Sequence, residues 1–282
     1  MTDHLIKPDP SSKIRMAITP ESAGWTYLSY AIVKLGPGET HEHLLVDQET
    51  AIVPLEGKGA VSIGEIETTL SRTSVFDEMP RVGYAPPGSA ISVTCPSAPG
   101  SSFEFAIGSA PAEGRYPARI IEPIEMASEL RGGGAAYRQV NNVLAPPIDA
   151  ERLILYEVYV PRGSWSGWPP HCHDGYDGSP YLEETYYFRL DPADGFCIHR
   201  NWRVDEAFDE ALVAGDRDCA LVTKGYHSTA AAPGSHMFFL NFLAGELVDG
   251  ERVTPPCFHD AYTWIEEDWT RFGWDLPRVR PR

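Results

Sequence analysis

The sequence Pro-Pro-His-Cys-His-Asp at residues 169–174 decides the fold. Its two histidines, His171 and His173, lie two residues apart, so on an extended segment both side chains point to one face. Two adjacent glutamates, Glu183-Glu184, follow on the next β-rich run, and His227 on a later one. Three imidazoles and one carboxylate form a ligand set that suits Zn, Mn, Fe, Ni or Co far better than Ca or Mg. The sequence therefore predicts one divalent metal ion per chain, held between strands.

The spacing of these residues resembles the two signatures of the cupin β-barrel, an HxH…E strand pair followed by a G-D…P-x-G-x-H strand pair. The second signature here reads Gly215-Asp216 and then Lys-Gly-Tyr-His at 224–227, with Thr223 where the cupin pattern usually has proline. The resemblance implies a small barrel with a metal inside it.

The resemblance also distinguishes the two adjacent glutamates. In the cupin pattern the ligand directly precedes a β-branched or aromatic triplet, and Glu184 precedes Thr-Tyr-Tyr at 185–187. The expected ligands are then His171, His173, Glu184 and His227. Glu183 would face away from the metal unless a β-bulge re-aims it.

Short β-rich runs separated by turn residues make up most of the chain. Examples lie at 27–33, 51–55, 90–94, 103–107, 153–160 and 237–242. The 25 glycines and 25 prolines suit tight turns, and no long apolar stripe of helical period appears. The sequence predicts an all-β architecture.

The order of motifs in the first half returns in the second half. Gly-Pro-Gly-Glu at 36–39, an HxH, a glutamate and Ala-Pro-Pro-Gly at 85–88 correspond to Pro-Arg-Gly at 161–163, the second HxH, Glu183-Glu184 and Gly-Tyr-His at 225–227. The repeat indicates two β-barrels in tandem, a bicupin.

The expected organisation has three parts. Residues 1–112 form an N-terminal barrel, residues 113–150 form a loop-like connector, and residues 151–282 form a C-terminal barrel with the metal site. The final residues carry three tryptophans, which we expect to anchor the tail to the body of the protein or to another subunit: Trp264, Trp269 and Trp274.

The N-terminal half serves as an internal control for the metal site. It has His41, His43 and Glu49, but the residues after Pro-Pro-Gly at 86–88 are Ser-Ala-Ile, with no histidine. We expect the N-terminal barrel to be degenerate and to serve packing and assembly. Whether His41 and His43 hold a second metal stays open.

Charge and cysteine content narrow the class of protein. The net charge of −17 argues against nucleic acid or an anionic membrane as a partner. The five cysteines are odd in number and scattered, which is not a disulfide framework. No signal peptide and no transmembrane run is recognised. We expect a cytoplasmic protein with free thiols.

Longer stretches resemble the 5-deoxy-glucuronate isomerase family, bacterial enzymes of myo-inositol catabolism. They lie at 37–40, 74–77, 86–88, 138–140, 167–174, 179–187, 224–227 and 239–241. The resemblance spans nearly the whole chain and is most specific at 181–187. Departures at Thr223, at 197–202 and after residue 259 leave open a related sugar acid as the substrate.

This resemblance implies an aldose–ketose isomerisation of 5-deoxy-D-glucuronate to 2-deoxy-5-keto-D-gluconate. A divalent metal, Zn first and Mn, Fe or Ni as alternatives, would act as a Lewis acid on an enediolate. The four ligands would leave two neighbouring positions of an octahedron open for the substrate. A hydride shift between the same carbons is the alternative route.

Candidate catalytic groups lie close to the ligands in the sequence. Glu183 is adjacent to Glu184, Tyr186 should share the face of Glu184, and Tyr226 adjoins His227. Lys224 is both a catalytic candidate and a candidate cation for the substrate carboxylate, since such a substrate is an anion. The other cations of that group are Arg138, Arg189 and Arg200.

Three rival functions share the predicted metal site. One is the sister bicupin isomerase that acts on the uronate from pectin breakdown, although the context of residues 181–185 favours the inositol branch. A cupin dioxygenase would use the same ligands with Fe or Cu. A bicupin without enzymatic activity would bind or store a ligand. For the isomerase of the inositol branch, the expected partner is a small sugar acid as substrate. The resemblance is also compatible with a homodimer.

Overall fold

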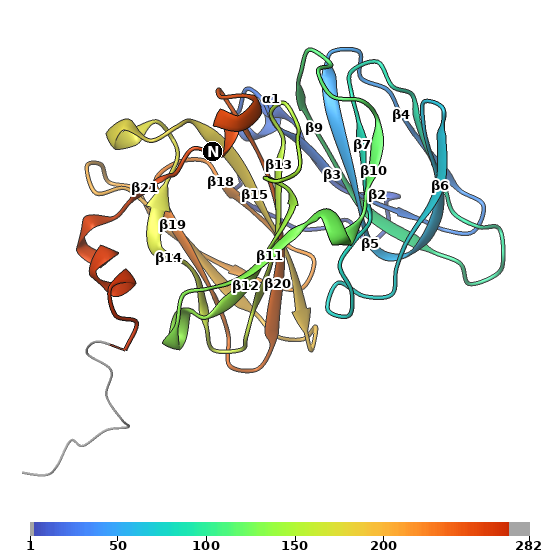
Figure 1. The fold of residues 1–282 in the computed structure, drawn as a ribbon. Helices are drawn as coiled ribbons and strands as arrows, with labels where there is room; N and C mark the ends of the chain where they lie inside the picture. The colour runs from blue at the N-terminus through green and yellow to red at the C-terminus, as the bar shows by residue number, and fades with distance from the viewer. Residues whose placement is uncertain (1–2, 271–282) are drawn as a thin grey trace, which may run out of the picture.

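The computed structural model describes residues 3–270. Two curled β-sheet bodies lie side by side, one drawn from blue to green and the other mainly from yellow to orange (Figure 1). We call the first the N-terminal barrel, built around a sheet of nine strands, and the second the C-terminal barrel, built from sheets of seven and five strands.

The elements of the N-terminal barrel are short strands joined by turns. Its strands are β2 (Ile14–Ile18), β3 (Ser29–Leu35), β4 (Thr40–His43), β5 (Gln48–Ile63), β6 (Ile66–Arg72), β7 (Val82–Ala85), β8 (Ile91–Thr94), β9 (Phe103–Pro111) and β10 (Arg119–Ile121). The long strand β5 serves both faces of the barrel, and its pairing register shifts between Pro54 and Glu56. A proline donates no ladder hydrogen bond, which favours a break at this point.

The C-terminal barrel takes its strands from the second half of the chain and from the N-terminus. They are β1 (Leu5–Ile6), β11 (Ala127–Arg131), β12 (Arg138–Leu144), β13 (Ile154–Val160), β14 (Trp165–Cys172), β15 (Leu182–Asp191), β16 (Cys197–Trp202), β17 (Asp209–Ala214), β18 (Cys219–Val222), β19 (Tyr226–Ala231), β20 (His236–Gly245) and β21 (Cys257–Phe258). Helical turns are short: α1 (Pro20–Ala23), η1 (Pro123–Glu125), η2 (Gly134–Ala136), η3 (Tyr176–Gly178), η4 (Asp249–Val253) and η5 (Asp260–Glu266).

The strand order is the same in both barrels. The main sheet runs β10-β7-β5-β9-β3-β2 in the N-terminal barrel and β1-β18-β15-β20-β13-β12 in the C-terminal barrel, where β11 follows. On the other face, β4-β8-β5-β6 corresponds to β14-β19-β16-β17. The all-β, two-barrel prediction is confirmed, and the correspondence identifies equivalent positions in the two halves.

The connector predicted at 113–150 is not a loop. Its strand β10 pairs with β7 of the N-terminal barrel, while β11 and β12 extend the main sheet of the C-terminal barrel. The N-terminal strand β1 crosses over and pairs with β18. Residues 1–112 therefore do not form one barrel by themselves. The strands β1, β10 and β11 are short edge strands, which show little periodicity because they form through their pairing with a neighbour.

One hydrophobic cluster includes side chains of both barrels and fills the space between them. The rings of Tyr30 on β3 and Phe242 on β20 have centroids 5.1 Å apart. Gly108 on β9 allows this close approach, because a Cβ there would lie 2.4 Å from Cδ1 of Phe242. The two barrels thus share a core across their interface.

A buried ion pair also joins the barrels. Arg72 at the end of β6 donates from Nη1 to Oε1 of Glu157 on β13 at 2.6 Å, and from Nη2 to Oε2 at 3.0 Å. Both side chains have no solvent exposure. The Tyr159 hydroxyl lies 3.1 Å from Nη2 of Arg72. Such a pair fixes the relative position of the barrels, since separating it would leave a buried charge unpaired.

Each barrel has one buried glutamate that accepts hydrogen bonds from the backbone of the other barrel, just before one of its main strands begins. Glu183 on β15 accepts hydrogen bonds from the backbone N–H groups of residues 26–28, just before β3, at 2.5, 2.8 and 2.8 Å. Glu49 on β5 accepts from residues 151–153, just before β13, at 2.9, 2.6 and 2.6 Å. The two sites occupy equivalent positions in the repeat, and we call them the reciprocal clasp.

All five cysteines are free; four are buried and Cys257 is half-buried. Across residues 3–270, no helix has both the length and the apolar character needed to cross a membrane.

Candidate metal centre

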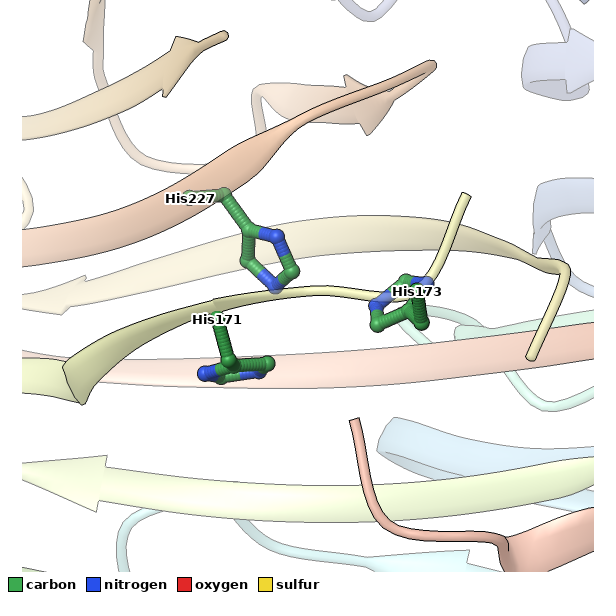
Figure 2. A group of neighbouring side chains, drawn as sticks. All are labelled: His171, His173 and His227. Atoms are coloured by element: carbon green, nitrogen blue, oxygen red, sulfur yellow. The ribbon is translucent and has the colours of Figure 1, made fainter. Parts of the chain in front are cut away.

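Three histidines converge inside the C-terminal barrel. His171 lies near the end of β14, His173 follows the last residue of that strand, and His227 lies on β19. His171 and His227 are direct partners in the antiparallel register of β14 and β19. Ligand atoms of the three rings all lie within 4.8 Å of one another. Figure 2 shows the three side chains turned toward a common space, as the i, i+2 spacing predicted.

Backbone carbonyls fix which nitrogen of two rings is free to bind a metal. Nδ1 of His173 lies 2.9 Å from the carbonyl oxygen of Leu182, and Nδ1 of His171 lies 3.3 Å from that of Pro169. A carbonyl oxygen only accepts, so each Nδ1 carries the proton and donates. The lone pair of Nε2 is then left for a metal, the arrangement by which proteins orient histidine ligands.

Glu184 completes the set from β15. Its Oε2 lies 2.9 Å from Nε2 of His173 and 3.2 Å from Nε2 of His227. Both ring nitrogens of His227 are buried without a hydrogen-bond partner among the described residues. A carboxylate oxygen and imidazole lone pairs are all acceptors, so they stay together only around a shared proton or cation. The residues present therefore fit a divalent metal ion.

The pKa values of these residues reflect their burial and their mutual contacts. Burial lowers the pKa of His171 well below its usual value, and the neighbouring imidazoles lower it further. Burial also disfavours a charged His173, but the hydrogen bond and charge of Glu184 outweigh it and raise the pKa. Burial would raise the pKa of Glu184, but the contacts with His173 and His227 hold it below the usual range. The carboxylate is thus ready to bind a cation.

Asp174 ties together the segments that carry the ligands. Its Oδ2 accepts from the backbone N–H of Gly225 at 2.8 Å and from Nη1 of Arg203 at 2.8 Å. Gly225 has φ of +82°, and a Cβ there would lie 2.3 Å from the carbonyl oxygen of Trp202. Only glycine fits this turn. The contact fixes the residue after His173 against the segment that leads into His227.

A cavity of about 480 Å³ adjoins the ligands. Its walls come from β12, β13, β14, β15 and β20, and from the tail that follows β20. Polar side chains beside the ligands include Arg138, Tyr156, Tyr186 and Asn241. The tail contributes Phe258, the neighbour of His171 across β14 and β21. The barrel thus has a partly open cavity at the proposed metal site, in which a few polar side chains stand among mainly apolar walls.

The N-terminal barrel has lost two of the four ligands. In the register of β4 and β8, His41 pairs with Val93 where His171 pairs with His227. The residue after Glu49 is Thr50, in the place that Glu184 takes after Glu183. Glu49 is thus the counterpart of Glu183 and not of the metal ligand. Two histidines remain without the carboxylate or the third imidazole.

Of the four catalytic candidates from sequence, the structure places only Tyr186 at the cavity. Glu183 lies on the other face of β15, where it forms part of the reciprocal clasp. Tyr226 points away from His227, with its ring 4.6 Å from that of His259. Lys224 donates to Glu206 at 2.8 Å with its side chain 38% exposed. These three placements do not support a catalytic role, and the side-chain alternation of strands explains the first two.

The arginines considered as partners of the substrate carboxylate also differ in whether they line the cavity. Arg189 pairs with Asp216 at 3.1 Å, and Arg200 pairs with Asp209 at 2.8 Å; neither lines the cavity. Arg138 does line it.

Sequence reasoning missed the cavity walls that come from outside the signature motifs. Tyr156 and Asn241 come from β13 and β20, and Glu266 comes from the tail. The tail is docked on the body, because a Cβ at Gly133 would lie 2.8 Å from Cβ of Trp269. Of the expected anchoring tryptophans, Trp274 lies outside the described residues. The tail carries no local pattern that indicates where it docks, so only the tertiary structure reveals these residues.

A sequence model of the KduI/IolB family matches residues 4–265. The chain belongs to the KduI/IolB family. Similar proteins include the 5-deoxy-glucuronate isomerase of Geobacillus kaustophilus (strain HTA426), which is 38% identical over 81% of this chain and 83% of its own. The 5-deoxy-glucuronate isomerase of Bacillus subtilis (strain 168) is 32% identical over 90% of this chain and 93% of its own.

Solved structures agree with this assignment. An IolB-like protein from Salmonella typhimurium LT2 superposes with a TM-score of 0.86 at 33% identity, covering 94% of this chain and 99% of that protein. The oxalate decarboxylase OxdC of Bacillus subtilis has a TM-score of 0.60 at 11% identity over 88% of this chain and 79% of its own. That second likeness shows the shared cupin fold alone.

In this KduI/IolB family member we expect the N-terminal histidines to be dispensable for metal binding. The double variant His41→Ala/His43→Ala should keep about one divalent ion per chain and change kcat/KM less than about twofold, because these residues lack two of four ligands. Elemental analysis and steady-state kinetics measure both quantities. A wild-type content near two ions, reduced to one in the variant, would show that this barrel also binds metal.

Proposed function

We propose that this protein is an aldose–ketose isomerase that converts 5-deoxy-D-glucuronate into 2-deoxy-5-keto-D-gluconate. Family membership and the names of its relatives support this activity. The observation that carries the proposal is the set of three histidines and Glu184 beside a cavity in one barrel. The cavity volume of about 480 Å³ lies within the range of small-molecule sites, roughly 300–1,000 Å³.

His171, His173, Glu184 and His227 would hold the metal. When bound, the ion would supply Lewis-acid stabilisation of negative charge that develops on substrate oxygens. Three nitrogens and one oxygen suit Zn, which we expect first, and also Mn, Fe and Ni. The carbonyl contacts of His171 and His173 hold these ligands in a fixed orientation before any ion arrives.

Tyr186 is the group that we assign as the acid that donates a hydrogen bond to the reacting oxygen. Burial, followed by the charge of Glu184, raises the pKa of Tyr186 well above its usual value, so the hydroxyl stays protonated. It lines the cavity beside the ligands. A protonated phenol there donates a hydrogen bond from Oη to a substrate oxygen, which favours the oxyanion of an enediolate over the neutral carbonyl.

The tail shields the cavity from water. The backbone N–H of His259 donates to the carbonyl of Pro170 at 2.8 Å, which holds the tail against β14. The ring of Tyr262 on η5 lies 5.0 Å from that of Trp168. An enclosed site lowers the local dielectric, so each charge in it acts more strongly on the reacting carbons.

The proposal is tested by direct turnover. Protein loaded with one equivalent of Zn or Mn is expected to convert 5-deoxy-D-glucuronate under nitrogen, followed by proton NMR. In D₂O, an enediolate route places deuterium on the former aldehyde carbon, whereas a hydride shift does not. Absence of turnover with every candidate metal, or turnover that consumes oxygen, would reject the isomerase assignment.

The variant Tyr186→Phe tests the proton assignment within the same experiment. It keeps the ring and loses the hydroxyl, so we expect kcat to fall about 10²-fold, a typical contribution of a positioned acid or base. The metal content and KM should change little. An unchanged kcat would remove Tyr186 from the mechanism without affecting the isomerase assignment.

Location and pathway are part of the same proposal. We place the protein in the cytoplasm, where its five free thiols would stay reduced. Its substrate would come from inositol breakdown. The membrane and nucleic acids are not expected partners of a chain with a net charge of −17.

A further inference from the structure

Arg138 is a cation in the wall of the cavity that forms no direct ion pair with any of the residues 3–270. Its Nη1 donates to the carbonyl of Ala136 at 3.1 Å, and its Nη2 donates to that of Trp168 at 3.3 Å. Its Nε is buried with no hydrogen-bond partner among the described residues. Within residues 3–270, no carboxylate lies within ion-pair distance of Arg138. Two carbonyls use only part of the five N–H groups that a guanidinium offers.

Burial without a directly paired counter-ion is unfavourable for a guanidinium. Burial first and the charge of Arg131 second lower the pKa of Arg138 to about 10, although the more distant charges of Glu266 and Glu129 act in the opposite direction. A buried, unpaired charge costs free energy that an anion in the cavity would offset. Proteins keep such groups where a ligand supplies the missing charge.

The other cation of the wall is already neutralised. Arg131 lines the same cavity, but its Nε donates to Oε1 of Glu129 at 2.9 Å and its side chain is 43% exposed. Arg138 is therefore the cation of the cavity wall with binding capacity to spare.

The position of Arg138 relative to the metal ligands suits a substrate with two functional ends. Trp168, which accepts from Arg138, lies on β14 three residues before His171. Tyr186 and Glu184, both on β15, line the same cavity as Arg138. The cavity thus presents the metal ligands, a phenol and a guanidinium to one bound molecule.

We propose that Arg138 binds the carboxylate of the substrate and sets the specificity for uronates over neutral sugars. This inference rests on the proposed function and deepens it. The planar guanidinium can donate two parallel hydrogen bonds to a carboxylate, a geometry that neither a neutral hydroxymethyl group nor a lysine reproduces. With the carboxylate held at Arg138, the aldehyde end of the chain extends toward His171 and Glu184.

Kinetics of Arg138→Gln test the inference. We expect kcat/KM for 5-deoxy-D-glucuronate to fall about 100-fold, mostly through KM, because a charge-assisted hydrogen-bond pair is lost. The metal content should stay at the wild-type value. Arg138→Lys should recover part of the loss, and Arg131→Gln, the matched control in the same wall, should stay within about threefold of wild type. A KM for Arg138→Gln equal to that of the wild type overturns the inference and leaves the isomerase assignment intact.

A binding measurement separates this inference from the proposed function. D-gluconate and D-glucitol are open six-carbon chains that differ at one end, carboxylate against hydroxymethyl. Calorimetry with metal-loaded wild-type protein should show gluconate binding at least about tenfold more tightly, and Arg138→Gln should abolish the difference. If the wild type discriminates in this way but does not isomerise 5-deoxy-D-glucuronate, the carboxylate subsite stands and the proposed substrate fails. Equal discrimination by wild type and Arg138→Gln rejects the subsite.

Discussion

Replacing His227 by alanine is expected to abolish metal binding and to lower kcat/KM by at least about 10³-fold. A Lewis-acid metal supplies several kcal/mol of transition-state stabilisation, and each 1.36 kcal/mol corresponds to a factor of ten in rate. His227 is fully buried, and its Nε2 lies 3.2 Å from Glu184 Oε2. With alanine at this position, only two imidazoles and one carboxylate of the proposed ligand set remain, and one coordination position loses its ligand. Elemental analysis of purified protein, beside steady-state kinetics, gives both quantities.

The matched control is a buried imidazole that is not a ligand. The His199 ring lies 6.1 Å from that of His227, and its Nε2 lies 3.0 Å from Oδ1 of Asn201. His199→Gln should keep about one ion per chain. If His227→Ala retained a full equivalent of metal and its activity, the ligand set described above would be wrong. If both variants lost the metal, the loss would reflect disruption of the barrel and not of a ligand.

The second large effect is on stability and comes from the reciprocal clasp. Glu183→Gln is expected to lower the free energy of unfolding by about 3 kcal/mol or more, because an amide nitrogen replaces one acceptor and leaves buried N–H groups unsatisfied. For a chain of this size that corresponds to a fall of roughly 10 °C in the melting temperature. Glu49→Gln should give a similar fall, since Glu49 accepts the same number of backbone hydrogen bonds. Thermal denaturation followed by circular dichroism measures both.

Glu184→Gln, one residue away on the same strand, is the control for this prediction. We expect it to reduce metal affinity and turnover while changing the melting temperature of metal-free protein by less than Glu183→Gln does. Glu183→Gln should keep about one metal ion per chain below its melting temperature. Equal melting temperatures for wild type and Glu183→Gln would show that the clasp does not hold the barrels together.

The sequence predicted those features that depend on local pattern. Alternation in a strand places His171 and His173 on one face whatever the rest of the fold does, and it separates Glu184 from Glu183. The same rule, applied to Tyr226 beside His227, would have removed that tyrosine from the candidates. The repeated order of motifs was enough to predict two barrels, because each motif lies at a turn or a strand end whose geometry is local.

The remaining features depend on partners distant in the chain. Nothing around Arg138 distinguishes it from Arg189 or Arg200; what differs is that the latter two meet a carboxylate after folding. Two strands of the connector, β10 and β11, are short edge strands, and their pairing partners decide their conformation. The role of Glu49 likewise becomes visible only when residues 151–153 pack against it.

The reciprocal clasp has a consequence for how the two halves of this chain can diverge. Along β15, Glu183, which joins the barrels, and Glu184, the proposed metal ligand, are neighbours on opposite faces. On β5, Glu49 keeps the first role and Thr50 stands in place of Glu184. The N-terminal barrel can therefore lack the carboxylate and the third imidazole without losing its connection to the C-terminal barrel. Thr50 and Val93 are buried, so packing alone limits their substitution, whereas Glu49 is also limited by the backbone N–H groups of residues 151–153, from which it accepts hydrogen bonds.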